Sequence, residues 1–89
     1  MSQAATPNDV SASTLAVLRE VCRQPNLVAS LDTGLDEIAD LDSLSVMEAV
    51  ALLESRFGVE VDTGALNHLG TVGDIVDLVT RALSRQAAG

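Results

Sequence analysis

Apolar residues recur at helical spacing in three stretches of this chain, and polar or glycine-containing segments separate the stretches. The first stretch predicts a helix that begins at Ser11 or Ser13, either of which is a suitable N-cap, and that ends before Pro25. Its apolar stripe consists of Leu15, Leu18, Val21 and Cys22. Residues 1–10 are small and mostly polar, and this composition predicts a flexible N-terminal arm.

The clearest pattern lies between Ser43 and Phe57. Its apolar positions fall at i, i+4, i+7 and i+11 on one helix face, namely Val46, Val50, Leu53 and Phe57. Gly58 follows directly and is the residue type that commonly ends a helix. Fifteen residues at about 1.5 Å each form a rod of roughly 22 Å, so we expect this helix to be the central packing element.

The last third of the chain predicts a short helix followed by a long one. The short helix is defined by Asp62 as its cap, Leu66 and Leu69 as its apolar residues and Gly70 at its end. Thr71 and Asp74 have the spacing of a capping box, which predicts the start of the last helix. The apolar stripe of that helix consists of Val72, Ile75, Val76, Val79 and Leu83. Residues 85–89 are expected to form a frayed tail.

The segment from Gln24 to Asp42 contains a proline, a glycine and several acidic residues, and it predicts a long loop that apolar residues anchor. The pattern as a whole predicts an all-α fold with three main helices and one short helix, and it requires no strand pairs. A chain of 89 residues amounts to one domain, which we place at residues 11–84. Phe57 is the only aromatic residue, so the core must consist of aliphatic side chains.

Thirteen acidic residues against five basic ones give the chain a formal net charge of −8. This charge argues against binding to nucleic acid and favours partners with basic surfaces. No apolar run approaches the length of a membrane span, and the first residues lack the features of a secretory leader. Cys22 is the only cysteine, so no internal disulfide forms, and we expect a cytoplasmic chain.

Side chains that carry catalysis or bind metals are sparse. We interpret His68, the single histidine, as a surface or capping residue, and Cys22 as a small buried apolar residue. The acidic residues before the second helix lack the spacing of a calcium-binding loop, so we interpret them as solvated. These residues are Asp32, Asp36, Glu37, Asp40 and Asp42. We therefore expect no catalytic residue, no resident metal ion and no enzymatic activity.

The motif Asp42-Ser43-Leu44 opens the helix predicted over residues 43–57. On composition alone, a serine at this position is most often a helix cap. In its context the motif resembles the D-S-L signature of the acyl carrier proteins and the related peptidyl carriers, in which it begins the second helix. The resemblance extends from about Leu15 to Leu83, and it is strongest in LDSLSVMEAV (41–50) and LESRFGVEV (53–61).

This resemblance implies that Ser43 is the attachment residue for 4′-phosphopantetheine, with Asp42 and Leu44 beside it. A phosphopantetheinyl transferase takes the group from coenzyme A, and the cargo is then carried as a thioester on which partner enzymes act. The implied fold is a four-helix carrier bundle with a long loop between its first two helices. A helix N-terminus suits this role, because its free N–H groups and its dipole favour a phosphodiester.

The family's recognition surface is the exposed side of the second helix. Carried over residue by residue, it consists here of Leu44, Met47, Glu48, Ala51 and Glu54. Such a mixed apolar and acidic strip suits basic patches on loading enzymes, synthases, transferases and tailoring enzymes. Spacing alone leaves two alternatives open: Leu44 and Met47 are partly buried under the preceding loop, and Glu48 is an ordinary solvated residue. A carrier that meets several enzymes in turn is expected to be a monomer with transient interfaces.

Three residues depart from the family pattern. Asp40 stands where many carriers have glycine, Ser45 where fatty-acid carriers often have an acidic residue, and Arg56 in an often acidic part of the helix. Together with basic residues that are all arginine and a high alanine content, these departures favour a discrete carrier of a specialised pathway, polyketide or nonribosomal peptide. We expect a freestanding acyl carrier protein of a polyketide or other specialised pathway. One alternative is a discrete aminoacyl or peptidyl carrier of the nonribosomal type. A second, from a different class, is an unmodified helical interaction domain whose serine is only a cap.

Overall fold

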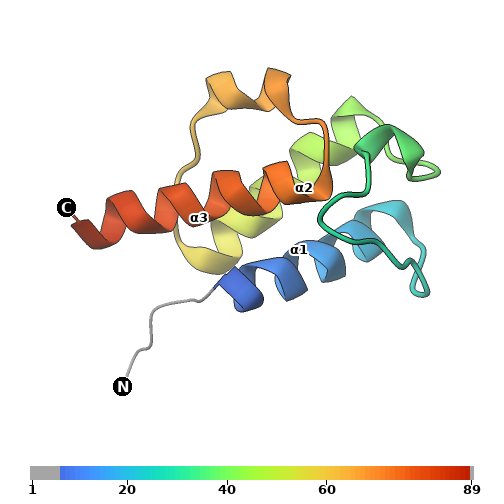
Figure 1. The fold of residues 1–89 in the computed structure, drawn as a ribbon, viewed down its shortest axis with the longest axis horizontal. Coiled ribbons are helices and arrows are strands. Elements are labelled where there is room, and N and C mark those ends of the chain that lie inside the picture. The colour runs from blue at the N-terminus through green and yellow to red at the C-terminus, as the bar shows by residue number, and fades with distance from the viewer. Residues whose placement is uncertain (1–6, 89) are drawn as a thin grey trace.

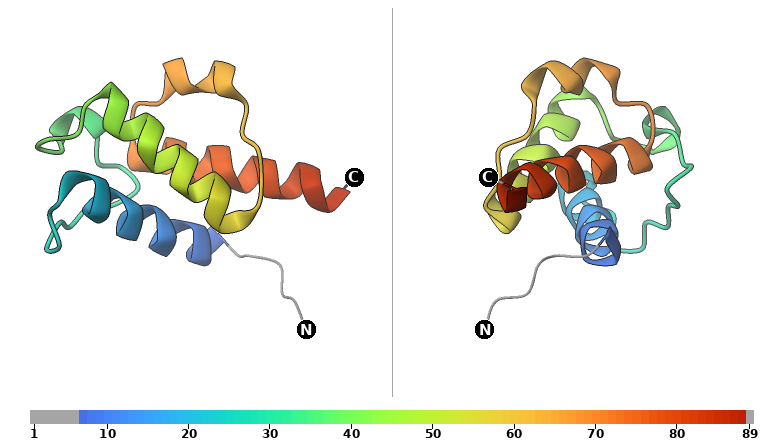
Figure 2. Two further views of the ribbon diagram at one scale, coloured as in Figure 1. Left: turned by 180° about the vertical axis from the view of Figure 1, so that it is seen from behind. Right: turned by 60° about the vertical axis from the view of Figure 1, so that its left-hand side comes forward.

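Three long helices lie side by side, and two 3₁₀ helices occupy the segments that connect them (Figure 1). The computed structural model describes residues 7–88. In chain order the elements are α1 (Pro7–Cys22), η1 (Leu35–Glu37), α2 (Ser43–Phe57), η2 (Thr63–His68) and α3 (Val72–Ala88). Figure 2 shows that η2 lies on the side of the bundle away from α1. The predicted all-α fold, with three main helices, a short fourth helix and a long first loop, is confirmed.

The core lies where the three long helices meet. The stripe predicted for α2 is confirmed, because Val50 and Leu53 are buried and Val46 and Phe57 pack against the core as half-buried residues. Ala49 is also buried there. In α3 four of the predicted positions are buried, and Leu83 is half-buried. The buried residues of α3 are Val72, Ile75, Val76, Leu78, Val79 and Ala82.

The buried face of α1 differs from the predicted one. Leu15 and Val21 are only half-buried, whereas Val10 and Val17 are fully enclosed. The buried residues of this helix are Val10, Thr14, Val17, Leu18 and Cys22, which lie on one face of a helix. Leu18 and Cys22 are buried as predicted, whereas the helix predicted from Ser11 or Ser13 excludes Val10, and the predicted stripe passes over Thr14 and Val17.

The predicted bounds of α1 and α3 were wrong at both outer ends. α1 begins at Pro7, inside the predicted arm, because proline is well suited to the first turn of a helix and Asp9 adds a favourable charge there. Residues 1–6 of that arm lie outside the described residues. α3 continues to Ala88 instead of ending near Ser84, since alanine, arginine and glutamine all favour helix. Gly89 also lies outside the described residues.

Both α1 and α2 end in a left-handed residue. After α2 this residue is Gly58, with φ 65°, as predicted. After α1 it is Arg23, with φ 56°, although side chains other than glycine seldom take this conformation. The N–H groups of Arg23 and Gln24 donate to the carbonyls of Glu20 (3.2 Å) and Arg19 (2.9 Å), which closes the last turn as in a Schellman motif.

The loop between α1 and α2 is fastened to the start of α3. The N–H groups of Val72 and Gly73 donate to the carbonyls of Thr33 (3.0 Å) and Leu31 (2.9 Å). In the other direction, the N–H of Leu35 donates to the Gly70 carbonyl (2.9 Å). Within residues 7–88, the only β pairing is an isolated bridge at this place, between Gly34 and Thr71. Apolar residues alone were predicted to anchor the loop. These backbone hydrogen bonds also fix the register of the loop against the start of α3.

Candidate functional site

Ser43 is the first residue of α2, and its side chain is exposed. The helix is capped by the residue before it, because Asp42 has an extended backbone and its Oδ1 accepts a hydrogen bond from the Ser45 N–H (2.8 Å). Among the hydrogen bonds within residues 7–88, none involves the Ser43 hydroxyl or the Ser43 N–H. The interpretation of this serine as only a helix cap is therefore wrong, and its hydroxyl is accessible for chemistry.

The start of α2 combines a negative cap with the positive end of the helix dipole. The backbone N–H and the hydroxyl of Ser45 hold the pKa of the Asp42 carboxyl below its usual value. Asp42 is thus ionised at neutral pH and keeps the first turn in place. The Ser43 N–H remains without a protein acceptor in the described part of the chain, so an anionic group attached to the serine has a donor within reach.

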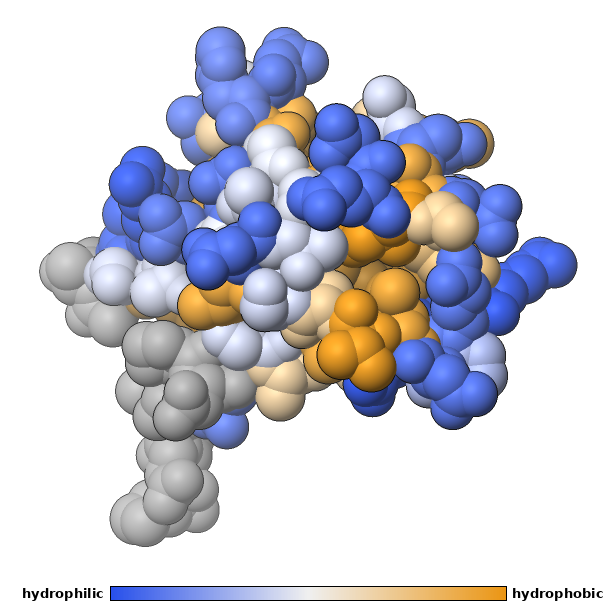
Figure 3. Space-filling model, turned by 45° about the vertical axis from the view of Figure 1, so that its right-hand side comes forward, coloured by the Kyte–Doolittle hydropathy of each residue, from blue (hydrophilic) through white to orange (hydrophobic). Residues whose placement is uncertain are grey.

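A cleft of about 700 Å³ opens beside Ser43, between the start of α2, η1 and η2. Its apolar lining includes Leu35, Leu41, Val46, Met47, Leu66 and Leu69, and its polar lining includes Asp36, Asp42, Ser43 and Asn67. Figure 3 looks onto the side of the molecule that lies to the right in Figure 1, where apolar surface is exposed between hydrophilic side chains. No local sequence pattern predicted that residues of η2 line this cleft, because spacing along the chain does not show how a short helix docks.

Four of the five predicted recognition residues share an exposed face of α2. Leu44 is 65% exposed and Met47 54% exposed, so more than half of each residue is accessible to solvent. Glu48 and Ala51 are also exposed. These four residues, Leu44, Met47, Glu48 and Ala51, are named the α2 face below. They combine apolar surface with one carboxylate, as the sequence predicted.

Glu54 differs from the α2 face. It is half-buried, and its Oε2 accepts a hydrogen bond from the backbone N–H of Val61 (2.9 Å). The carboxylate thus ties the end of α2 to the segment that leads to η2. Its expected role on the recognition surface needs this correction, because the side chain already has a structural partner.

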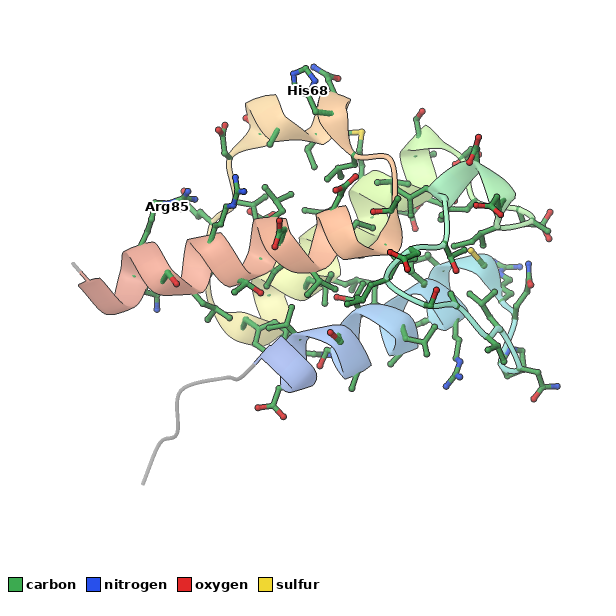
Figure 4. All side chains as sticks on the ribbon, in the orientation of Figure 1. His68 and Arg85 are labelled. Carbon is green, nitrogen blue, oxygen red and sulfur yellow. The ribbon has the colours of Figure 1, made fainter. Side chains whose placement is uncertain are left out.

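His68 and Cys22 lie where the sequence predicted them, one on the surface and the other buried. His68 is exposed on η2 and points away from the three long helices (Figure 4). Cys22 is buried, and desolvation raises the pKa of its thiol, with a further contribution from the charges of Asp40 and Asp42. Over residues 7–88 there is no group of three side chains that could hold a metal ion. Within the same range, no helix is long and apolar enough to cross a membrane.

Comparison with known proteins adds a family match to this geometry. The model of the phosphopantetheine attachment site family matches residues 13–79. The acyl carrier protein of Acidothermus cellulolyticus is 33% identical over 66 residues, which are 74% of this chain and 79% of that protein.

Two solved structures are similar along most of their length. The holo acyl carrier protein from Geobacter metallireducens has a TM-score of 0.75 and 32% identity, over 89% of this chain and 90% of that one. The acetyl form of the actinorhodin acyl carrier protein from Streptomyces coelicolor also has a TM-score of 0.75, with 27% identity, over 97% of this chain and 99% of that one.

Proposed function

We propose that Ser43 is the attachment residue of this chain, which belongs to the family of phosphopantetheine-binding acyl carrier proteins. Members of this family are carriers without catalytic activity of their own. One observation supports the proposal most directly: at the start of α2, Asp42 caps the helix and the Ser43 hydroxyl is left exposed. A serine that only capped the helix would hold that hydrogen bond itself.

The residues around Ser43 fit a phosphopantetheine group. When bound, the group supplies a thiol on a flexible arm, on which an acyl group is carried as a thioester. The Ser43 N–H and the helix dipole favour the negative phosphodiester, and Asp42 holds the first turn that presents them. The chain contributes position: a tethered cargo meets each partner enzyme at a high local concentration.

We propose further that the α2 face is the surface that partner enzymes contact. Leu44 and Met47 give it apolar area next to Ser43, and Glu48 gives it negative charge, to which the neighbouring Asp42 adds. A basic patch with an apolar centre is complementary to this surface. The partners are the phosphopantetheinyl transferase, a loading enzyme and the synthase or tailoring enzymes of the pathway. The cytoplasmic location and the monomeric state stay predictions.

For the cargo we propose acyl intermediates of a polyketide or other specialised pathway. The similarity to the carrier of the actinorhodin polyketide synthase from S. coelicolor, over almost the whole length of both chains, supports this proposal. The relatives and structures named above are all acyl carriers, which favours an acyl cargo over the aminoacyl cargo of a peptidyl carrier. The polar residues Asp36 and Asn67 in the cleft also suit a short or oxygen-rich chain better than a long alkyl chain.

The attachment is tested by intact mass after incubation with coenzyme A and a phosphopantetheinyl transferase of broad specificity. We expect one phosphopantetheine on the wild type and none on Ser43→Ala. Ser55→Ala is the matched control, because it removes another exposed serine of α2 and should leave the modification complete. A folded wild type that stays unmodified, or a Ser43→Ala variant that gains the group, would contradict the proposal.

The cargo class is tested by loading Ser43 from a series of acyl-coenzyme A donors and measuring thermal unfolding. We expect little difference between holo, acetyl and acetoacetyl forms, and no steady rise in melting temperature from six to twelve carbons. Opening this small aliphatic core around a long chain would sacrifice packing that the domain needs. A stabilisation that grows with chain length would instead favour a carrier of long fatty chains.

A further inference from the structure

Gln24 connects the end of α1 to the segment that leads into Ser43. Its Nε2 donates a hydrogen bond to the backbone carbonyl of Ala39 (2.8 Å) and lies 3.5 Å from Oδ2 of Asp40. Residues 39–42 are named the approach segment here, because they form the last stretch of chain before the serine. The contact is distant in sequence, and the family pattern does not draw attention to it.

The backbone of Gln24 is itself fixed from two sides. Its N–H donates to the Arg19 carbonyl (2.9 Å) in the closing turn of α1, and its carbonyl accepts from the Leu27 N–H (3.0 Å). The Arg19 guanidinium also donates to the Leu27 carbonyl (2.8 Å). The side chain of Gln24 therefore extends from a rigid point toward the approach segment.

The approach segment contains a backbone conformation that needs support. Asp40 has φ 65°, in the left-handed region that glycine adopts readily and that is unfavourable for most other residues. The Ala39 carbonyl belongs to the peptide plane that precedes this φ rotation. A hydrogen bond to that carbonyl thus limits the rotation that would release Asp40 to a commoner conformation.

The direction of the approach segment sets the start of α2. Leu41 anchors it as a half-buried residue, and its N–H donates to the Ile38 carbonyl (3.3 Å). Asp42 then caps the helix through the Ser45 N–H (2.8 Å). A change at Asp40 would therefore move the cap and the exposed hydroxyl of Ser43 together.

We infer that Gln24 is a positioning residue for the modification of Ser43, through its hold on the left-handed Asp40. The inference rests on the proposed function of Ser43. Without the Gln24 side chain, a smaller fraction of molecules has the approach segment in the arrangement that a transferase recognises. Because only that fraction binds, the apparent affinity for the transferase falls while the bound complex reacts as before.

The test compares phosphopantetheinyl transfer to wild type, Gln24→Ala and Gln24→Glu. For Gln24→Ala we expect KM for the carrier to rise about fivefold, as the loss of one hydrogen bond allows, with kcat within twofold of wild type. Gln24→Glu should raise KM at least as much, since a carboxylate cannot donate to Ala39 and repels Asp40. Gln86→Ala is the matched control, because it removes an exposed glutamine of α3 outside the residues of this site.

A rescue experiment tests whether Gln24 acts through the backbone of Asp40. Asp40→Gly in the Gln24→Ala background should return KM to within twofold of wild type, because glycine takes a left-handed conformation without support. Asp40→Ala in the same background should not restore it.

The outcomes separate this inference from the proposed function. Failure of the folded wild type to accept the group would contradict the role of Ser43. A wild type that is modified, with an unchanged KM for Gln24→Ala, would overturn the role of Gln24 alone, as would a raised KM that Asp40→Gly does not restore. Amide spectra of the unmodified proteins give a second measurement: the Ser43 and Leu44 signals should shift in Gln24→Ala and stay in place in Gln86→Ala.

Discussion

An aspartate stabilises the N-terminus of both α2 and α3: Asp42 directly precedes α2, and Asp74 lies in the first turn of α3. The two helix starts differ in how many of their backbone N–H groups bind within the protein. At α3 the N–H groups of Val72 and Gly73 bind loop carbonyls, and that of Asp74 binds the Thr71 hydroxyl (3.2 Å). The Asp74 carboxylate in turn accepts from the N–H groups of Gly70 (2.7 Å) and Thr71 (3.0 Å). All of these donors are satisfied within the protein.

At α2 the Asp42 carboxylate binds the Ser45 N–H, and the N–H of Ser43 has no acceptor within residues 7–88. A helix start that exists to hold the fold satisfies its donors with its own chain. A helix start that receives an anionic group keeps a donor and an adjacent nucleophile exposed. On the proposed function, this contrast distinguishes the helix start that is modified, at Ser43, from the helix start that holds the first loop, at Thr71.

The largest expected effect comes from disrupting the start of α3, where the first loop is bound. A Cβ at position 73 would lie 2.9 Å from the backbone carbonyl oxygen of Leu31, so Gly73→Ala forces the loop away from α3. We expect a loss of about 1–3 kcal/mol in the free energy of unfolding, measured with urea, although alanine usually favours helix. Gly64→Ala is the control, because its nearest neighbour is the flexible end of Asp62 at 3.3 Å, and it should cost much less. An unchanged stability for Gly73→Ala would show that the loop does not depend on this contact.

The charge of the α3 cap has a smaller effect, and one that depends on pH. The N–H groups of Gly70 and Thr71 hold the pKa of Asp74 below its usual value of 3.8. A lowered pKa in the folded state adds stability at any pH above that value, and the stability is lost as the pH falls through the folded pKa. Asp74→Asn should therefore cost about 1 kcal/mol at pH 7 and less at pH 2. Urea unfolding at both pH values measures this, and an equal cost at both would contradict the role of the charge.

The smallest expected effect concerns the α2 face beside Ser43, and the change leaves the fold intact. Glu48→Lys reverses the one carboxylate of the α2 face, so kcat/KM for phosphopantetheinyl transfer should fall roughly fivefold, with unchanged helix content by circular dichroism. Glu60→Lys makes the same charge change at an exposed position beyond α2 and should have little effect. Equal losses in both variants would mean that net charge, and not the α2 face, governs the encounter.

Sequence patterns predicted those features that neighbouring residues determine. The bounds of α2, the left-handed Gly58 and the capping box of Thr71 and Asp74 all follow from contacts within a few residues, and all are confirmed. The start of α1 was missed because its buried face depends on what the other helices cover. A local pattern does not show that Val10 meets a core built from residues far along the chain.

The same distinction holds at the site. The importance of Ser43 came from a family resemblance, whereas the assignment of the cap to Asp42 required the backbone, since both residue types cap helices well. The bond from Glu54 to Val61, the hold of Gln24 on Ala39 and the lining contributed by η2 are all contacts that no spacing rule predicts. They arise only when separate segments are placed in space.

The fastening of the first loop to α3 divides that loop into parts that tolerate change in length differently. Leu31, Thr33 and Leu35 bind in alternation along the start of α3, so one residue inserted among them would offset every partner beyond it. Val28 lies upstream of this register and is 85% exposed. Extra residues, a peptide tag or new chain termini are best accommodated there, where the chain can lengthen without moving either the core or Ser43.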